Sequence, residues 1–555
     1  RCDRLNQPCS YNQAHPRRTR DDQLKQLQER LTKAEAQLAL TTPDPQSNPA
    51  ISAMNTPIDL DHTTGLDAAT DTAVNSSNIF TSFTDGADTN MLFDWTNEPL
   101  AALEPLDDVL LNQHQSCLGS GPEEDLSPAD LGLLHDHYFN SVYYSFPFVS
   151  RDRFITDSTS GGSPATSALV YAVALAGCAH YLGDTERQAT CYNLARDYVE
   201  RCERKDLMKD MNCLQALLLI GRFEAMSRKL ERSWLTLGRA AMLCRLLRLH
   251  QMDAVRHDQG IQNGKNDSGI LSGLPYTEDV ALLEERRRTF WALYILQSYV
   301  KTRTGWDCQL GDVKDFRVCL PSPGLLSSDL EPLRMPYLLD VSTESGSEIT
   351  SYAGCVLMVE LALSCFDRDQ QYGIPGFWDG YCTLVKKAED LSVILKHHLK
   401  ATSIREDPIA FSLYMNLRAT EIFLHDMAIM KSEEQGLPPY MRIENQRRAT
   451  AAAFQICNAV GLNLPSPRKA NSDIIMLQAI FIAWPLFMAL KALHRELRDG
   501  EVQKTTNGVV AASKLLFAAL DHIEESDGHW HRSLTHVGTK LQEWEEKTEF
   551  NSSAL

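Results

Sequence analysis

Two cysteines near the start of the chain have the spacing of metal ligands. Cys2 and Cys9 are separated by six residues, and Ser10-Tyr11 follows them. Thiolates at this separation can share a zinc ion, but a structural zinc site needs four ligands. The chain holds no C-x-x-C pair that would complete the set. On their own, the two cysteines supply only half of the ligands that such a site needs.

No catalytic motif accompanies these cysteines. The chain lacks G-x-S-x-G, H-E-x-x-H and a dinucleotide-binding glycine fingerprint after a strand. Twelve of its 14 cysteines lie between Cys117 and Cys457, mostly in apolar, helical-looking sequence. This placement is typical of reduced, buried side chains in an intracellular protein. We expect that the protein is not an enzyme.

Charge changes sharply along the 555 residues. Against a single acid, the first 20 residues carry Arg1, Arg4, Arg17, Arg18 and Arg20. Between Ala34 and Ser150 there is no lysine or arginine, whereas aspartate and glutamate recur. The formal net charge of −19 argues against a protein that coats nucleic acid through bulk basicity. It leaves room for a small basic module attached to an acidic body.

Residues 21–40 are predicted to form a short dimerising coiled coil. The apolar seam alternates steps of three and four residues through Leu24, Leu27, Leu31, Ala34 and Leu38. Asp21 and Asp22 stand at the N-terminal end, where negative charge favours the helix dipole. The seam lasts less than three heptads, so an isolated amphipathic helix or a linker is the alternative.

Residues 41–125 are predicted to be a disordered acidic segment, because Thr, Ser, Asn, Pro and Asp dominate their composition. Within residues 76–111, acids alternate with apolar side chains that include Phe80, Phe83, Phe93 and Trp95. The acids keep these aromatic residues exposed to solvent, so that a groove on a partner protein can take them as a short induced helix. The alternative is a plain acidic linker whose apolar residues dock on its own body.

Residues 126–545 are predicted to be an all-α body, followed by a disordered tail at 546–555. Ser127-Pro128 begins the first helix with an N-cap and a proline at the first helical position. Further helical runs are expected at 166–181, 211–225, 232–250, 281–300, 352–366, 409–431, 446–461, 472–494 and 507–523. The uncharged stretch 474–490 could suggest a membrane span, but Gln478 and Pro485 interrupt it. A buried helix explains it better, and no membrane association is expected.

The body also contains a run of basic residues and scattered tryptophans. Arg286–Arg288 follows Glu284 and Glu285 in an expected helix, so ion pairing inside the protein is favoured over phosphate binding. The tryptophans Trp234, Trp291 and Trp484 are expected in the core, with an effector cavity between helices as the alternative.

With these residues in view, the chain resembles a known family. The segment from Arg1 to Tyr11 looks like the end of the six-cysteine binuclear zinc cluster of fungal transcription factors, with Cys2 and Cys9 as its fifth and sixth ligands. The other four ligands would lie upstream of Arg1, so we interpret the chain as N-terminally truncated. With two of the six ligands, the segment is not expected to fold the cluster or to bind a specific DNA site.

The body resembles the same family's middle regulatory region. The similar motifs are His137-Tyr138-Phe139, Phe146-Pro147-Phe148-Val149, Trp234 to His250, Glu284 to Trp291, Thr304-Gly305-Trp306 and Leu320-Pro321. Many members carry Asp-Arg where this chain has Gln297-Ser298. The order and spacing of the motifs extend the resemblance over most of the chain.

The resemblance implies a nuclear, zinc-dependent regulator of RNA polymerase II transcription that binds CGG-type half-sites in double-stranded DNA as a homodimer. Two zinc ions would bind in the complete module, and residues 1–20 would be its remnant and basic linker. Arg17, Arg18 and Arg20 are the best candidates for phosphate contacts, with a nuclear-import signal or solvated linker as the alternative.

Residues 76–111 would recruit coactivators, and the body would respond to a partner or to a small-molecule effector. The alternative functions are a naturally truncated dimerising repressor without DNA binding, and a helical small-molecule-binding protein.

Overall fold

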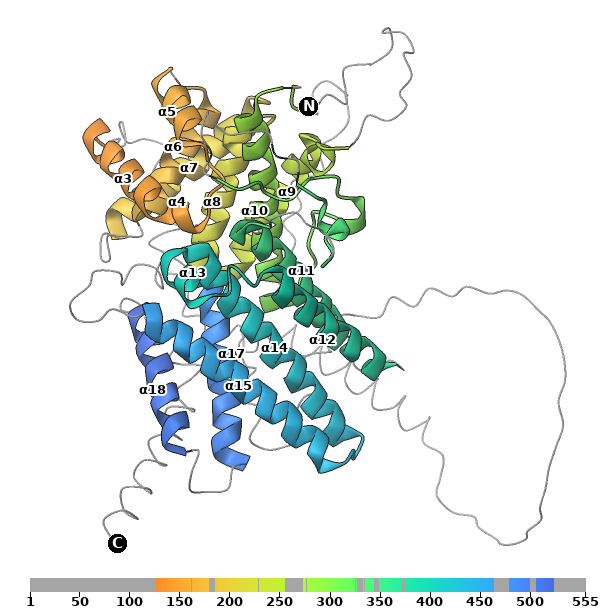
Figure 1. The fold of residues 1–555 in the computed structure, drawn as a ribbon. Coiled ribbons are helices and arrows are strands. Elements are labelled where there is room, and N and C mark those ends of the chain that lie inside the picture. The colour runs from red at the N-terminus through yellow and green to blue at the C-terminus, as the bar shows by residue number, and fades with distance from the viewer. Residues whose placement is uncertain are drawn as a thin grey trace, which may run out of the picture. The chain divides into compact units, whose positions relative to one another are not determined.

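The computed structural model describes residues 126–523 except 161, 179–184, 228, 255–272, 276, 325, 327–332, 334, 344–348, 371–375, 464–478 and 500–505. Within these described residues the chain forms α-helices, short 3₁₀ turns and one isolated bridge between Cys319 and Tyr337, without a β-strand (Figure 1). The predicted all-α fold is therefore confirmed. In the same part of the chain, no helix is long and apolar enough to cross a membrane.

A first group of helices occupies the upper part of Figure 1. Its members are α3 (Pro128–Asn140), α4 (Val142–Ser145), α5 (Arg151–Thr159), α6 (Pro164–Gly177), α7 (Thr185–Arg204), α8 (Met211–Met226), α9 (Leu230–Leu246) and α10 (Val280–Thr304). The helix α3 begins as predicted: the Ser127 hydroxyl accepts a hydrogen bond from the Asp130 backbone N–H at 3.1 Å. The helix α6 packs closely against α3. At Gly177 of α6 the two helices are so close that a Cβ atom would clash with the Leu134 carbonyl of α3.

The central helix of the first group is α10. Asp279 caps its start by accepting hydrogen bonds from the backbone N–H groups of Ala281 (2.9 Å) and Leu282 (3.2 Å). Gly305 ends it with φ 73°, in the left-handed region that glycine enters without strain. Between these ends the helix is buried on most sides and packs against α8, α9 and α11 (Ser351–Gln370). This burial is the reason why its sequence shows little amphipathic alternation.

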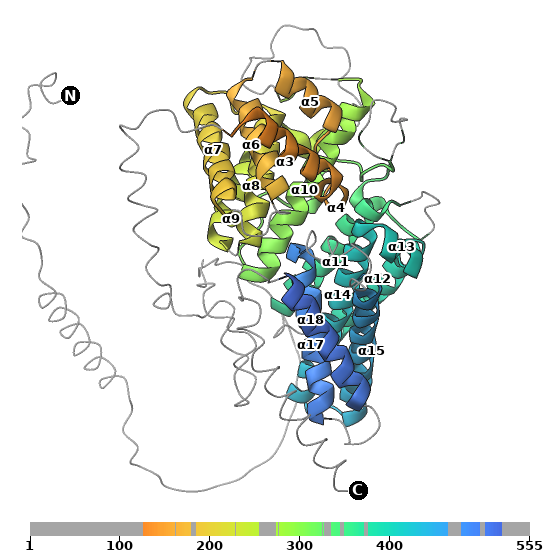
Figure 2. The same ribbon diagram turned by 90° about the vertical axis from the view of Figure 1, so that its left-hand side faces the viewer.

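A second group of helices follows below the first in Figures 1 and 2. After α11 come α12 (Phe377–Ile394), α13 (Ala401–Glu406), α14 (Pro408–Glu434), α15 (Pro439–Asn463), α17 (Ala479–Asp499) and α18 (Thr506–Ile523). The helix α14 belongs to two hydrophobic clusters: Leu413 and Leu417 join the first, and Met415 and Ala419 join the second with α15, α17 and α18. The two clusters therefore meet along α14.

Two carboxylates, one half-buried and one buried, bridge neighbouring helices. The Tyr294 hydroxyl on α10 donates a hydrogen bond of 2.6 Å to Glu360 on α11, and burial raises the pKa of Glu360 despite this bond. Asp426 on α14 accepts from Lys491 (3.0 Å) and Arg495 of α17. Burial alone would raise the pKa of Asp426, but the two cations outweigh it and hold the pKa below its ordinary value.

Some helix predictions are corrected by the structure. The expected run 232–250 is too long: α9 ends at Leu246, because Arg248 adopts a left-handed conformation (φ 58°) before a 3₁₀ turn at Leu249–Gln251. The run 472–494 is observed as α17, which begins at Ala479 among the described residues and continues to Asp499. The helices α5, α7, α12 and α13 were not expected.

Candidate functional site

The arginine run at the start of α10 holds two loops of the body. Arg287 makes a bidentate ion pair with Asp253, with N–O distances of 2.7 and 2.9 Å. Asp253 in turn accepts a hydrogen bond of 2.9 Å from the backbone N–H of Cys319. Arg288 pairs with Glu284 at 2.9 Å and donates to the carbonyl of Ser322 at 3.0 Å. These contacts tie the segments after α9 and after α10 to the central helix.

A second network joins α5 and α8 to α10. Arg153 donates to both carboxylate oxygens of Glu285, at 2.7 and 2.8 Å, and also to Asp157, Asn212 and Gln215. Glu285 is 1% exposed at its side chain, whereas Arg153 is 21% exposed. Burial lowers the pKa of Arg153, but the hydrogen bond and charge of Glu285 outweigh it and raise the pKa overall. The guanidinium thus remains charged inside the fold.

The first network confirms the structural interpretation of the arginine run. The guanidinium groups of Arg287 and Arg288 face protein carboxylates and carbonyls. Arg286 donates to the carbonyl of Pro275 at 2.9 Å. With their donors directed into the protein, these arginines are unsuited to binding DNA phosphates.

The three tryptophans have different environments. Trp291 is fully buried, and its indole N–H donates to the Cys319 carbonyl at 2.8 Å, so its predicted core position is confirmed. Trp234 is half-buried against the first cluster, and its ring lies 5.4 Å from that of Trp306. Trp484 lies at the side of a cavity between helices, which is the alternative that the sequence left open.

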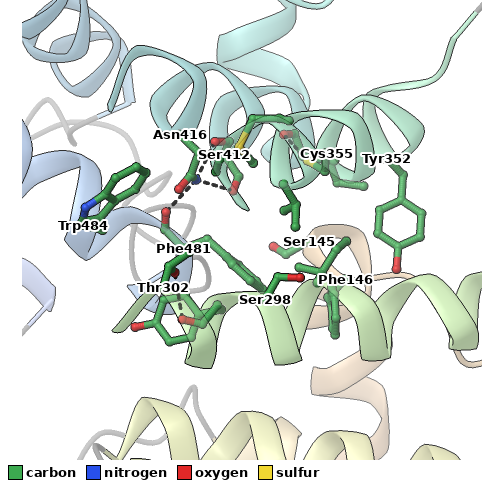
Figure 3. Close-up of a pocket in the computed structure, with 16 residues that line it drawn as sticks. Ser145, Phe146, Ser298, Thr302, Tyr352, Cys355, Ser412, Asn416, Phe481 and Trp484 are labelled. Atoms are coloured by element: carbon green, nitrogen blue, oxygen red, sulfur yellow. Dashed lines mark hydrogen bonds between the residues drawn. The ribbon is translucent and has the colours of Figure 1, made fainter. Parts of the chain in front are cut away.

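This cavity lies where the two hydrophobic clusters meet (Figure 3). Its volume is about 60 Å³, which is room for roughly four water molecules. Its walls come from α4, α10, α11, α14 and α17, and include Phe146, Ile295, Tyr299, Met358, Val359, Phe481 and Trp484. A small apolar group fits such walls.

A proline creates an unusual polar contact at the cavity. Pro485 lies inside α17 and lacks the N–H that would bond the carbonyl of Phe481, four residues earlier. Asn416 of α14 supplies the missing donor. The Asn416 side-chain amide donates to the Phe481 carbonyl at 2.7 Å and to the Ser412 carbonyl at 2.8 Å. Figure 3 shows these bonds beside the cavity. The contact fixes the start of α17 against α14.

The remaining polar groups of the cavity are neutral. The Ser298 hydroxyl donates to the Tyr294 carbonyl at 2.7 Å, and that of Thr302 donates to Tyr299 at 2.9 Å. Each hydroxyl oxygen can still accept a hydrogen bond. Burial raises the pKa of Tyr352 and of Cys355, so both stay protonated at neutral pH. Since no charged side chain lines the cavity among the described residues, an uncharged occupant suits it.

Sequence reasoning missed most of the cavity. Its signals were a lone Asn416 in an apolar helix, a proline within another such helix, and Ser298 at a position where the resembled family often carries charge. None of these signals shows by itself which helices meet.

The sequence-predicted site residues all lie outside the described residues. They are Cys2 and Cys9 for zinc, Arg17, Arg18 and Arg20 for phosphates, Leu24, Leu27, Leu31 and Leu38 for dimerisation, and Phe80, Phe83, Phe93 and Trp95 for activation. In the part of the chain that the structure covers, no group of three or more His, Cys, Asp or Glu side chains could hold a metal ion. These predictions stay predictions.

Comparison with known proteins points in one direction. Residues 135–336 match the fungal specific transcription factor domain. The chain is 63% identical to the depudecin biosynthesis cluster-specific transcription activator of Alternaria brassicicola, over 100% of this chain and 95% of that protein. It is 58% identical to the activator of the same description from Fusarium langsethiae, over 100% and 94% of the two chains. The pigment biosynthesis transcriptional activator of Monascus ruber is 23% identical over 60% of this chain and 62% of its own. No solved structure matches the chain.

Proposed function

Because the chain belongs to the family of fungal transcription activators that carry the fungal specific transcription factor domain, we propose that it activates the genes of a depudecin biosynthesis cluster. The observation that carries this proposal is the 63% identity over the full chain to an activator so described. The chain is a transcription regulator, and residues 135–336 of its helical body match the domain that the family shares.

DNA recognition is proposed to come from the N-terminal residues. Cys2 and Cys9 would supply two of the six thiolates that hold two zinc ions, together with cysteines preceding Arg1. Arg17, Arg18 and Arg20 would contact phosphates, and the seam at residues 21–40 would pair two chains on CGG-type half-sites in the nucleus. The charge distribution supports this arrangement, because the first 20 residues are basic although the whole chain carries a net charge of −19.

Gene deletion tests the regulatory target. We expect that loss of the gene lowers transcripts of one group of neighbouring biosynthetic genes, while transcripts elsewhere in the genome stay constant. Reintroduction of the gene restores these transcripts, and a Cys9→Ser version fails to do so although its protein accumulates normally. Unchanged cluster transcripts in the deletion strain would refute the proposed target. Restoration by Cys9→Ser would refute the zinc role alone.

A second function is favoured by the neutral cavity. We propose that a small uncharged molecule binds there and modulates activity. Propan-2-ol is a suitable probe, because its four heavy atoms match the size of the cavity and it combines apolar methyl groups with one hydroxyl group. At ten times its dissociation constant, it would stabilise the folded state by about 1.4 kcal/mol.

Cavity filling provides the matched test. Ala362 lines the cavity, whereas Ala451 is exposed on α15. We expect that propan-2-ol raises the thermal unfolding midpoint of the wild type and of Ala451→Leu but leaves that of Ala362→Leu unchanged. An equal rise in all three proteins would show binding elsewhere.

A further inference from the structure

An apolar stripe on α9 faces solvent. Leu235, Met242 and Leu246 expose 61%, 63% and 46% of their surface. Steps of seven and four residues place them on one face of the helix. The opposite face, with Leu237, packs into the first cluster. Figure 2 shows α9 at the edge of the upper helices, next to α8.

Basic side chains flank this stripe. The exposed charged residues of α9 are Glu231, Arg232, Arg239 and Arg245. Arg239 lies 3.6 Å from Glu203 of α7, in a pair whose side chains are 43% and 37% exposed. Such an exposed pair is weak and leaves the guanidinium accessible. We name Leu235, Arg239, Met242, Arg245 and Leu246 the α9 face. It is a basic, apolar surface on a protein whose net charge is −19.

The chain itself contains a segment with the complementary chemistry. Residues 76–111 carry seven acids and no lysine, arginine or histidine. Aromatic and leucine side chains alternate with these acids. Apolar contacts to the stripe and ion pairs to its flanking arginines can therefore form together.

The segment is also long enough to reach the face. Sixteen residues separate Leu111 from Pro128, where α3 begins. Extended, they span up to about 55 Å. A folded body of about 400 residues has a radius of gyration of about 21 Å. The extended linker is therefore longer than twice the radius of gyration of the body, so α9 is within its reach.

We propose that residues 76–111 dock on the α9 face of the same chain. The docked segment withholds its aromatic side chains from other proteins. Because the segment is proposed above to recruit coactivators, docking keeps the regulator silent until a competitor displaces it. This regulatory consequence rests on the proposed function, whereas the docking itself does not.

Photo-crosslinking of the full chain tests the docking directly. Benzoylphenylalanine replaces Phe93, and mass spectrometry identifies the peptides that it joins. We expect cross-links to residues 230–246. To distinguish a segment of the same chain from that of a second copy, ¹⁵N-labelled and unlabelled protein are mixed before cross-linking. The mixture is held until any dimers have exchanged subunits. Pairs of uniform label show docking within one chain, whereas pairs of mixed label would overturn the proposal in favour of a second copy.

Exposed substitutions supply the control. Met242→Glu combined with Leu246→Glu adds two carboxylates against an acidic segment and removes two apolar contacts, so cross-link yield should fall about tenfold. Ile443→Glu, on α15, changes a residue that is 59% exposed and should leave the yield unchanged. Cross-links to other helices, or equal yields in all three proteins, would overturn the docking.

A transcription reporter separates the two proposals. If docking silences the segment, the Met242→Glu, Leu246→Glu protein activates the reporter more strongly than the wild type and Ile443→Glu do. If cross-links to α9 form but no variant activates the reporter, the docking stands and the activation role of residues 76–111 is overturned. A stronger reporter signal in Ile443→Glu than in the double variant would overturn silencing by the α9 face.

Discussion

The ion pair between Arg153 and Glu285 gives the sharpest stability prediction. Glu285→Gln keeps the size of the side chain but removes the charge that two guanidinium N–H groups face at 2.7 and 2.8 Å. Removing one partner of a buried pair costs about 3–5 kcal/mol. Here Asp157 remains 2.7 Å from Arg153, and its side chain is 33% exposed, so it compensates in part. We therefore expect a loss of about 2–4 kcal/mol.

Urea unfolding of the full chain, followed by tryptophan fluorescence and circular dichroism, measures this loss. With a slope of at least about 3 kcal/mol/M for a body of this size, the midpoint moves down by about 1 M or less. Glu444→Gln is the matched control, because that carboxylate pairs with Arg447 and Arg448 on the surface and should not move the midpoint.

A double-mutant cycle isolates the pair itself. Arg153→Met alone leaves Glu285 buried without its cation, so it should also destabilise the body. The two changes together should cost less than the sum of the separate costs, with a coupling of about 1–3 kcal/mol. Additive costs, or a Glu285→Gln midpoint equal to that of Glu444→Gln, would refute the idea that this pair holds α5 against α10.

Three further changes test other parts of the body. Asn416→Ala removes the donor to the Phe481 carbonyl and should cost about 1–3 kcal/mol in urea unfolding; in a Pro485→Ala background, where the backbone supplies an N–H, the cost should shrink. Glu360→Gln concerns a group whose folded pKa is raised, so wild-type stability is lost as pH rises above about 4.5 and the variant should gain relative stability from pH 4 to 7. Asp426→Asn concerns a lowered pKa: its stabilisation is present above the ordinary value of 3.8 and lost as pH falls through the folded pKa. The variant should therefore lose about 3–5 kcal/mol at pH 7 and progressively less below pH 4. A cost of Asn416→Ala that is equal in both backgrounds, or variant differences that do not change with pH, would contradict these assignments.

Sequence reasoning succeeded where local rules decide the structure. The start of α3 follows from the N-cap Ser127 and the proline after it, and both act within one turn. The helix α7 was missed because charged and polar residues dominate it. Its buried residues Cys191, Ala195, Val199 and Cys202 nevertheless recur at helical spacing, which is the signal that could have revealed it.

Partners that are distant in sequence could not be predicted. The charge pattern favoured pairing of the arginine run with Glu284 and Glu285, and Arg288 does pair with Glu284. Glu285 instead forms an ion pair with Arg153, which lies 132 residues earlier in the chain. Such a choice depends on how α5 packs against α10, and the sequence period of a single helix does not contain that information.

The location of the cavity bears on how a helical body can respond to a small molecule. A ligand shifts a conformational equilibrium only if it binds the two arrangements with different affinity. The walls include Phe146 and Ile295 from the first cluster and Trp484 from the second, so a molecule between them contacts both packing units. Each cluster is closely packed and resists deformation internally. The Asn416 bond to Phe481 is the polar contact that fixes the junction of the two clusters at the cavity. An occupant that strengthens or weakens it changes how α17 sits on α14, which gives an uncharged molecule a physical route to altering the body.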